Sequence, residues 1–411
     1  MHVVIFEGIR WDTFAPLALN KPTFVLPCGM GTLLDKQLDL LKPDRLTLWV
    51  RPQLAEYCRQ MVAPKLKIPT SVNTPLDDQP TLLATGRTLH LARFEMPEEP
   101  SAVVEEGELL RFARVEKMAG LSPEDVFRRS DKWMKIFQLP RTAPQARFVD
   151  RIWDLISWNE EALMTDFVRW HDASTVPGDG PWHLINSDDI RISKGAKLAP
   201  GCVLDASRGP IVLDVGASIG ANAVLEGPCY IGQYAQIAPL TTISAGTTIG
   251  AICKVGGEIR NSIISSYSNM PHHGFVGNSF IGSWVNLGAG TMTSDIKNTY
   301  GEVTMQIGAT EHKTGRRRLG VMIGDHSKIA VGSRLDTGSY VGFCCQLSGS
   351  QLTPKFVPSY SFWTDEGMQK YHIDKAIEVA RRMMDRRDKP WTELDEQLMR
   401  YVAEVAPTVE K

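Results

Sequence analysis

The chain has 411 residues and carries 45 basic against 47 acidic side chains, a formal net charge of −2. With a net charge so close to zero, the chain has no strong positive electrostatic potential that would attract nucleic acid or an anionic membrane surface. We therefore expect neither as a partner. The start of the sequence lacks a basic segment followed by an apolar one, and no stretch approaches the roughly 18 apolar residues of a membrane span. We therefore expect a cytoplasmic protein. Its seven cysteines show no Cys-x-x-Cys spacing, which indicates reduced thiols, mostly buried.

The first part of the chain is predicted to be an α/β domain over residues 1–118. The strand-like stretches HVVIF and RLTLWV alternate with the helix-like stretches DKQLDLL and QLAEYCRQ. This alternation is typical of a sheet with crossover helices. Residues 119–185 are predicted to form a mainly helical segment that ends in a Pro- and Gly-rich linker.

A six-residue repeat fills the middle of the chain. Its aliphatic positions follow one another without a break at Leu213, Ile219, Leu225, Ile231, Ile237, Ile243, Ile249 and Val255. The same spacing occurs upstream and downstream at Ile192, Leu198, Leu204, Phe275, Ile281, Leu287, Ile323, Ile329, Leu335, Val341 and Leu347. Neither the 3.6-residue period of an α-helix nor the two-residue period of a strand fits this spacing. The pattern predicts a parallel β-helix over residues 186–352, with about 18 residues per coil and the aliphatic side chains inside.

Two further segments accompany the repeat. Residues 295–319 are too long for a corner, so we expect them to cover a site or to reach another subunit. Residues 353–411 are predicted to be a C-terminal extension with an amphipathic helix that packs back on the rod. The apolar stripe of that helix consists of Ile373, Ile377, Ala380 and Met384.

A pair of histidines, His272 and His273, lies in residues 260–274, where the regular aliphatic–glycine pairs are missing. Departures from a local pattern concentrate at functional sites. An imidazole with a pKa of about 6.5 can accept a proton at cellular pH. On an extended chain the two adjacent rings point to opposite faces. If His272 is catalytic, we therefore expect His273 to have no catalytic role.

The stretch HHGFVGNSFIGSWVNLGAGT, which begins at His272, resembles the acetyltransferase half of the GlmU-like family. That family comprises bifunctional N-acetylglucosamine-1-phosphate uridyltransferase/glucosamine-1-phosphate acetyltransferases. The motifs KVGGE, YSN, GDHSK and VPS, at 254–258, 267–269, 324–328 and 357–359, are similar to those of its shorter members. The resemblance covers about residues 190–385. It implies a Rossmann-like nucleotidyltransferase-like domain, a left-handed parallel β-helix, and a homotrimer with sites between neighbouring rods.

The resemblance implies roles for single residues. His272 would be the general base that takes a proton from the amine of glucosamine 1-phosphate as it attacks the acetyl-CoA thioester. Arg260, Phe275 and Asn286 would contact the sugar phosphate, although the family has lysine and tyrosine at the first two positions. The alternatives are a surface cation for Arg260 and a backbone-bonding corner residue for Asn286.

The same resemblance places Ala289 and Asp295 near acetyl-CoA. Asp295 and Val331 replace an asparagine and a serine of the family, which leaves the acyl donor and acceptor open. The C-terminal helix also carries arginines at 381, 382, 386 and 387. They form either a solvated face or a clamp for the phosphates of an acyl-CoA.

In the front domain the family has a glycine-rich loop that wraps phosphates with backbone N–H groups. The segment 29–32 looks like this loop, but its neighbours resemble the segment that follows it, so we expect the loop at residues 7–12. That loop has one glycine, and no acidic residue for Mg²⁺ lies within 83–88. Phosphate binding by Arg10, Lys21 and Arg87 remains open, and Mg²⁺ is expected only if this domain is active.

Three hypotheses follow. The first is an acetyl-CoA-dependent N-acyltransferase that acts on an amino-sugar phosphate and requires no metal in the rod. Together with nucleotidyl transfer by the front domain, this activity would serve UDP-N-acetylglucosamine biosynthesis. The second is a non-catalytic regulatory or scaffold protein with a degenerate front domain. The third is a zinc lyase similar to the γ-carbonic anhydrases, with ligands among His272, His273, His312 and His326.

Overall fold

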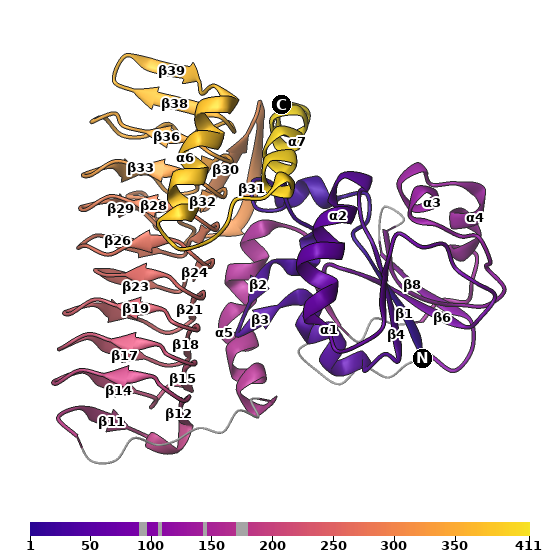
Figure 1. Ribbon diagram of the computed structural model, residues 1–411, viewed down its shortest axis with the longest axis horizontal. Helices are drawn as coiled ribbons and strands as arrows, with labels where there is room; N and C mark the ends of the chain where they lie inside the picture. Colours follow the sequence, from indigo (N-terminus) through magenta and orange to yellow (C-terminus); the bar gives the residue numbers. More distant parts are fainter. Residues whose placement is uncertain (90–96, 106–108, 143–145, 170–179) are drawn as a thin grey trace.

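The computed structural model describes residues 1–89, 97–105, 109–142, 146–169 and 180–411. Figure 1 shows a rod of stacked coils on one side and a smaller α/β domain on the other, with a long helix between them. None of the helices in these ranges is long and apolar enough to cross a membrane.

The front domain is built on a six-stranded sheet with the order β5-β4-β1-β6-β9-β8. The first four of these strands are parallel, β9 runs antiparallel to them, and β8 pairs antiparallel with β9 and therefore has the direction of the first four. The strands are β1 (His2–Phe6), β4 (Arg45–Trp49), β5 (Thr70–Val72), β6 (Thr81–Thr85), β8 (Ser101–Glu105) and β9 (Leu109–Val115). The short strand pairs β2 (Pro27–Cys28) with β3 (Gly31–Thr32) and β7 (Thr88–Leu89) with β10 (Arg147–Phe148) lie beside this sheet.

The helices of the front part are short except for the first and the last. Thr32 begins the first with a reciprocal capping box to Asp35. The α-helices are α1 (Leu33–Leu41), α2 (Ala55–Tyr57), α3 (Pro123–Arg128), α4 (Asp131–Ile136) and α5 (Ile152–Arg169). Helix α5 runs along the rod and separates it from the front domain (Figure 1).

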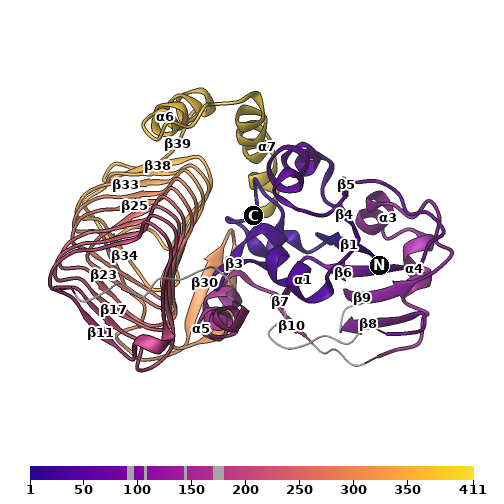
Figure 2. The same ribbon diagram turned by 60° about the horizontal axis from the view of Figure 1, so that its bottom comes forward.

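The rod consists of three parallel sheets, which we call the first, second and third face (Figure 2). The first face contains β11 (His183–Ile185), β14 (Val203–Asp205), β17 (Val224–Glu226), β20 (Thr242–Ile243), β23 (Glu258–Arg260), β26 (Phe275–Gly277), β29 (Met292–Thr293) and β34 (Arg334–Leu335). The second contains β12 (Ile190–Ile192), β15 (Ile211–Leu213), β18 (Cys229–Ile231), β21 (Thr247–Ile249), β24 (Ile263–Ile264), β27 (Phe280–Ile281), β32 (Met322–Ile323), β35 (Tyr340–Val341) and β37 (Phe356–Val357). The third contains β13 (Lys197–Leu198), β16 (Ser218–Ile219), β19 (Gln236–Ile237), β22 (Lys254–Val255), β25 (Asn269–Met270), β28 (Asn286–Leu287), β33 (Lys328–Ile329), β36 (Gln346–Leu347), β38 (Ser361–Thr364) and the antiparallel β39 (Gly367–Lys370).

The predicted fold class, an α/β domain followed by a parallel β-helix whose left hand the family resemblance implied, is confirmed. All eight aliphatic residues of the unbroken repeat are at most 3% exposed. Each contributes on the order of 1.5–3 kcal/mol by burial, which holds the coils together without disulfides. Corner glycines permit the close stacking: a Cβ on Gly220 would lie 2.4 Å from the backbone nitrogen of Pro239 in the next coil. The parallel ladder extends from β11 to β38, beyond the predicted limits 186 and 352.

The coils shorten in the region around the histidine pair. Ile249 is in register with Ile264 and Ile264 with Ile281, spacings of 15 and 17 residues instead of about 18. The prediction that Phe275 points into the core is therefore wrong. Val276 is the fully buried residue of β26, while Phe275 is half-buried on the outer side.

The interruption of the repeat forms a β-hairpin of β30 (Val303–Ile307) and β31 (Thr310–Arg316). Val303 and Met305 are fully buried in the apolar cluster that includes α5, and Arg316 lies 3.2 Å from Asp154 of that helix. Within this chain, the segment expected to cover a site or to reach another subunit thus packs against α5.

The C-terminal extension contains α6 (Ile373–Asp385) and α7 (Glu393–Val409). The predicted amphipathic helix corresponds to α6: Ile377 and Ala380 are buried in an apolar cluster with residues of the rod, Ile373 is partly buried against that cluster, and Met384 is also buried. Helix α7 continues to the front domain, where Leu394 and Leu398 join its apolar core (Figure 1). The end of the chain thereby ties the rod to the front domain.

Candidate functional site

The corner between the third and first faces carries His272 and His273. The chain leaves β25 at Met270 and enters β26 at Phe275, and both imidazoles between these strands are exposed. In the next coil the amide of Gly290 donates to the carbonyl of His273 at 2.7 Å, so Ala289 lies on the same corner. Successive coils are about 4.8 Å apart. The structure therefore brings the predicted base and a predicted acetyl-CoA contact to one edge of the rod.

The next coil adds Val331 to this corner. The amide of Gly332 donates to the carbonyl of Ala289 at 2.7 Å, and Val331 is 74% exposed. The edge therefore presents an open apolar side chain where the family pattern has a serine.

Asn286 lies on the third face beside this corner. Its strand β28 pairs with β25 at Asn269 and with β33 at Lys328, while the adjacent Leu287 points into the core. The Nζ of Lys328 donates to the carbonyls of Trp284 at 3.0 Å and His326 at 2.6 Å. Burial lowers the pKa of Lys328 to about 8. Sequence analysis assigned no role to Asn269 or Lys328, although both belong to the quoted YSN and GDHSK motifs.

Arg260 and Phe275 lie on the first face, on the other side of the corner. The Arg260 guanidinium is 6.0 Å from the centroid of the Phe275 ring and 3.2 Å from the carboxylate of Glu258. Half of each charged side chain is covered, so the cation remains within reach of a ligand. The structure thus brings two of the predicted sugar-phosphate residues together.

Asp295 lies at the opposite edge of the first face and is 5% exposed. Its carboxylate accepts a hydrogen bond from the side-chain amide of Asn278 and lies 3.5 Å from the Arg318 guanidinium. These partners hold Asp295 away from the corner of His272.

The site residues therefore diverge within one chain. Asn286 faces out of the third face, whereas Arg260 and Phe275 face out of the first, and the two faces meet at the convex corner that carries His272. Side chains on two sides of a convex edge cannot enclose a small ligand, because binding sites are concave. A complete site at this corner requires a second surface.

In the front domain the loop at residues 7–12 is held by a buried ion pair. The carboxylate of Glu7 is 3.0 Å from the Arg51 guanidinium, which stacks 3.5 Å from the centroid of the Trp11 ring. A cavity lined by Gly8, Arg87 and other residues at the ends of β1 and β6 has a volume of about 20 Å³. This volume suits about one water molecule.

The three predicted phosphate-binding residues do not converge. Arg10 is half-buried at the loop, whereas Lys21 lies 2.5 Å from Asp325 of the rod. Arg87 is buried and lies 3.4 Å from Asp150. The structure therefore directs these three cations toward different surroundings.

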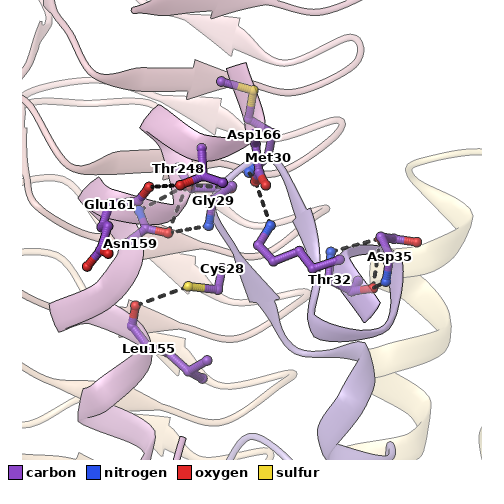
Figure 3. A network of polar contacts seen from close by, with 12 residues as sticks. Cys28, Gly29, Met30, Thr32, Asp35, Leu155, Asn159, Glu161, Asp166 and Thr248 are labelled. Carbon is purple, nitrogen blue, oxygen red and sulfur yellow. Dashed lines mark hydrogen bonds and ion pairs between the residues drawn. The ribbon is translucent and has the colours of Figure 1, made fainter. Parts of the chain in front are cut away.

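The turn at residues 29–32, which resembles a phosphate loop, contacts α5 instead (Figure 3). The amide of Gly29 donates to Asn159 at 2.6 Å, and that of Met30 donates to Asp166 at 2.8 Å. Asp166 also lies 2.5 Å from the buried Lys36. The first two backbone donors of this turn are thus occupied by side chains of α5, and the amide of Thr32 donates to Asp35 of α1.

The histidines considered as zinc ligands are spread over the molecule. His272 and His273 share one corner, His326 is buried at the corner between the second and third faces, and His312 belongs to β31. In the part of the chain that the structure describes, no three His, Cys, Asp or Glu side chains form a group that could hold a metal ion.

Comparisons with known proteins agree with this architecture. Residues 3–174 match the sugar nucleotidyl transferase family. A bifunctional sugar-1-phosphate nucleotidylyltransferase/acetyltransferase from Sulfurisphaera tokodaii is 31% identical over 393 residues, which cover 83% of this chain and 94% of that protein. A nucleotidyltransferase-like domain joined to a left-handed β-helix defines the class. The chain belongs to the family of bifunctional sugar-1-phosphate nucleotidylyltransferase/acetyltransferases.

Other relatives match over a smaller part. Bifunctional GlmU proteins from Picosynechococcus sp. and Methanococcus vannielii are 30% and 33% identical over 146 and 133 residues, which cover 35% and 32% of this chain. The matches span 27% and 31% of those relatives' own length. Among solved structures, an Arabidopsis UDP-N-acetylglucosamine acyltransferase and the corresponding O-acyltransferase from Moraxella catarrhalis are 15% and 13% identical, with TM-scores of 0.25 and 0.26. The matched regions span 56% and 54% of this chain and 92% and 96% of those two proteins. Because the TM-scores are this low, we base no statement about the fold on these matches.

Proposed function

We propose that the chain is an acetyl-CoA-dependent N-acyltransferase that acts on an amino-sugar phosphate, with His272 as the general base. The observation that carries the proposal is the position of His272: an exposed imidazole on a corner of the rod, one coil from Ala289. Arg260 and Phe275 flank this corner on one face and Asn286 on the other.

The chemistry at this corner is a direct acyl transfer. The amine nitrogen attacks the thioester carbonyl while the imidazole of His272 takes a proton from it. The C–N bond forms, the C–S bond breaks, and the thiolate that leaves takes up a proton, which gives an amide and free coenzyme A. A placed base accelerates such a step by about 10²- to 10⁴-fold. The Arg260 guanidinium supplies the positive charge for the phosphate of the acceptor.

The active form is a homotrimer in this proposal. Because Arg260 and Asn286 lie on two sides of a convex corner, a second rod is needed to make the site concave, and a closed ring of three copies provides one such surface for every corner. Light scattering is expected to give three times the 45.7 kDa mass of the chain. A monomer that acetylates at full rate would contradict the shared site.

The match of residues 3–174 to sugar nucleotidyl transferases favours a second activity, the transfer of a nucleotide to a sugar 1-phosphate by the front domain. It would require Mg²⁺ and would place both steps in the cytoplasmic synthesis of UDP-N-acetylglucosamine. Arg10, Lys21 and Arg87 are the candidate phosphate-binding residues, but they do not converge, so the family match carries this second proposal. Pyrophosphate release from a panel of nucleoside triphosphates with N-acetylglucosamine 1-phosphate and Mg²⁺ tests it; no release with any nucleotide would leave the front domain as a structural element.

Thiol release from acetyl-CoA tests the principal proposal. The amine panel contains glucosamine 1-phosphate, galactosamine 1-phosphate, glucosamine 6-phosphate and unphosphorylated glucosamine, and mass spectrometry identifies the acetylated product. We expect coenzyme A release that depends on an amino-sugar phosphate. Release no faster than hydrolysis with every amine would contradict the proposal and favour the scaffold hypothesis.

A further inference from the structure

A cavity of about 580 Å³ lies at the C-terminal end of the rod, where β38, β39, α6 and α7 come together (Figure 1). One part of its lining is the corner at residues 358–361, which leads from the second face to the third. Another part is the segment 368–373, which contains the end of β39 and the start of α6. Helix α7 completes the lining with Ala403, Ala406 and Pro407. A volume of this size is typical of pockets that bind a small organic molecule.

The cavity is separate from the candidate acyl-transfer site. Its corner joins the second face to the third, whereas the corner of His272 joins the third face to the first. No residue that we assign to the acyl transfer lines the cavity. The proposed function therefore does not account for it.

The inner wall of the cavity is apolar and held in a fixed shape. The rings of Tyr360 and Tyr371 belong to it and are 6% and 9% exposed. The Tyr360 hydroxyl donates to the carbonyl of Met399 in α7 at 2.6 Å, and the amide of Tyr371 donates to the carbonyl of Tyr360 at 2.7 Å. The amide and the hydroxyl of Ser359 both donate to the Glu410 carboxylate at 2.7 Å. Because these polar groups already have partners, the wall offers a ligand mainly apolar and aromatic surface.

The charged side chains in the lining are all basic. Lys370 and His372 line the cavity and are exposed to solvent, so they lie at its opening, and no carboxylate lines it. Asp374, the acidic residue in the first turn of α6, lies 3.0 Å from Arg400 of α7. The N-terminal end of α6 adds partial positive charge at this opening. The cavity therefore combines an apolar interior with a cationic opening.

We propose that this cavity binds a small organic anion with an aromatic body. Its carboxylate lies at Lys370, because hydrogen bonds from an ammonium to a carboxylate are stronger than those to a neutral group. Its rings contact Tyr360 and Tyr371, since aromatic pairs gain free energy beyond the area that they bury. Such a ligand contacts the rod, α6 and α7 together. Because α7 also packs in the front domain through Leu394 and Leu398, the bound ligand stabilises the joint between the two domains.

Calorimetric titration of the full chain with three probes tests the class of ligand. The first is 2-naphthoate, the second is 2-naphthamide, which has the same rings without the charge, and the third is octanoate, which has the charge on an aliphatic chain. We expect 2-naphthoate to bind at least about tenfold more tightly than the other two. Equal affinities for the acid and the amide would overturn the anionic class, and tighter binding of octanoate would overturn the aromatic one.

Two variants test the position of the site. Lys370→Gln removes the ammonium at the opening and is expected to weaken 2-naphthoate at least about fivefold without changing the amide. Its matched control is Lys375→Gln, which changes an exposed lysine of α6 that does not line the cavity. Ala403→Trp fills part of the cavity and is expected to weaken both naphthalene probes. Its matched control is Gln397→Trp, at an exposed position of the same helix outside the lining.

No binding of 2-naphthoate by the wild type would overturn the proposal, as would one affinity shared by the wild type and both cavity variants. A loss in Lys375→Gln as large as that in Lys370→Gln would also contradict it, because the attraction would then come from the general charge of the surface. Lys370 is exposed, so its variant should fold and decides the question even if Ala403→Trp does not fold. The titration needs no acyl transfer, and its result is therefore independent of the proposed function.

Discussion

The ammonium of Lys21 lies 2.5 Å from the carboxylate of Asp325, so a residue of the front domain and a residue of the rod form an ion pair that is 13% and 4% exposed. Asp325 also accepts hydrogen bonds from the Asn20 side chain at 3.1 Å and from the amide of Ser283 at 2.9 Å. The carboxylate therefore links the two domains at several points.

Asp325→Asn is expected to lower the free energy of unfolding by about 3 kcal/mol, because removing one partner leaves the other charge buried and unpaired. Urea unfolding monitored by tryptophan fluorescence measures this loss. Glu116→Gln is the control, since it breaks the more exposed contact with Arg114 and should cost less than about 1 kcal/mol. Equal midpoints for Asp325→Asn and wild type would show that the ion pair does not hold the domains together.

Asn159 of α5 is a second link between the domains (Figure 3). Its side chain accepts from the amide of Gly29 and donates to the carbonyl of Gly246 at 2.8 Å and to the hydroxyl of Thr248 at 3.0 Å. Asn159→Ala leaves buried polar groups unpaired, which is expected to cost about 2–4 kcal/mol in unfolding free energy. Chemical denaturation checks this value. Ser157→Ala, on the same helix, is expected to stay within about 0.5 kcal/mol of the wild type, and a similar loss in both variants would contradict the assigned role of Asn159.

The sequence predicted the rod better than the contacts that join the front domain and α5 to it. Residues such as Leu213 and Ile231 recur with the period of the coil, and the burial of each follows from local spacing alone. The coils around Phe275 are shorter than the repeat, so the repeat spacing wrongly predicted that this side chain points into the core of the rod. Gly29, Asn159 and Thr248 contact one another although they are far apart in the sequence. No periodic sequence pattern predicts such contacts.

The candidate site was predictable only in part. His272 and Ala289 share a corner because they occupy equivalent positions in successive coils, and the family resemblance, not the interrupted repeat, singled out both residues. The cavity at the end of the rod depends instead on how α6 and α7 lie against the last coil. That placement is set by tertiary packing, and sequence analysis could predict only that the apolar stripe of α6 packs against the rod.

All seven cysteines are free and buried, so the native protein should resist thiol reagents. Burial raises the pKa of Cys28, Cys229, Cys253 and Cys344 to about 12, and the reactive thiolate is therefore scarce at neutral pH. We expect almost no reaction of the native chain with Ellman's reagent and seven reacting thiols after denaturation. Rapid labelling of the native protein would contradict the burial.

Stability should fall in mild acid because two histidines are buried in the neutral form. Burial lowers the pKa of His326 to about 3 and that of His2 to about 4. Below pH 6.5 the unfolded chain binds protons that the native chain does not, so stability decreases as the pH falls from 6.5 to 4. Each histidine contributes up to about 3 kcal/mol to this loss.

His326→Asn tests this acid sensitivity. Asparagine tolerates the backbone φ of +62° at this corner and does not titrate in this range. Urea unfolding at pH 6.5 and pH 4 is expected to show a smaller difference for the variant than for the wild type. An undiminished difference would show that His326 is protonated in the native protein.

The catalytic constant for acetyl transfer to the best amine of the panel, measured for the wild type, His272→Ala and His273→Ala, tests the central claim most directly. The account predicts that His272→Ala lowers kcat by about 10²- to 10⁴-fold. His273→Ala, a change of another exposed ring on the same corner, should stay close to the wild type. A His272→Ala variant that retains the wild-type kcat would contradict the claim that this imidazole accepts the proton of the attacking amine.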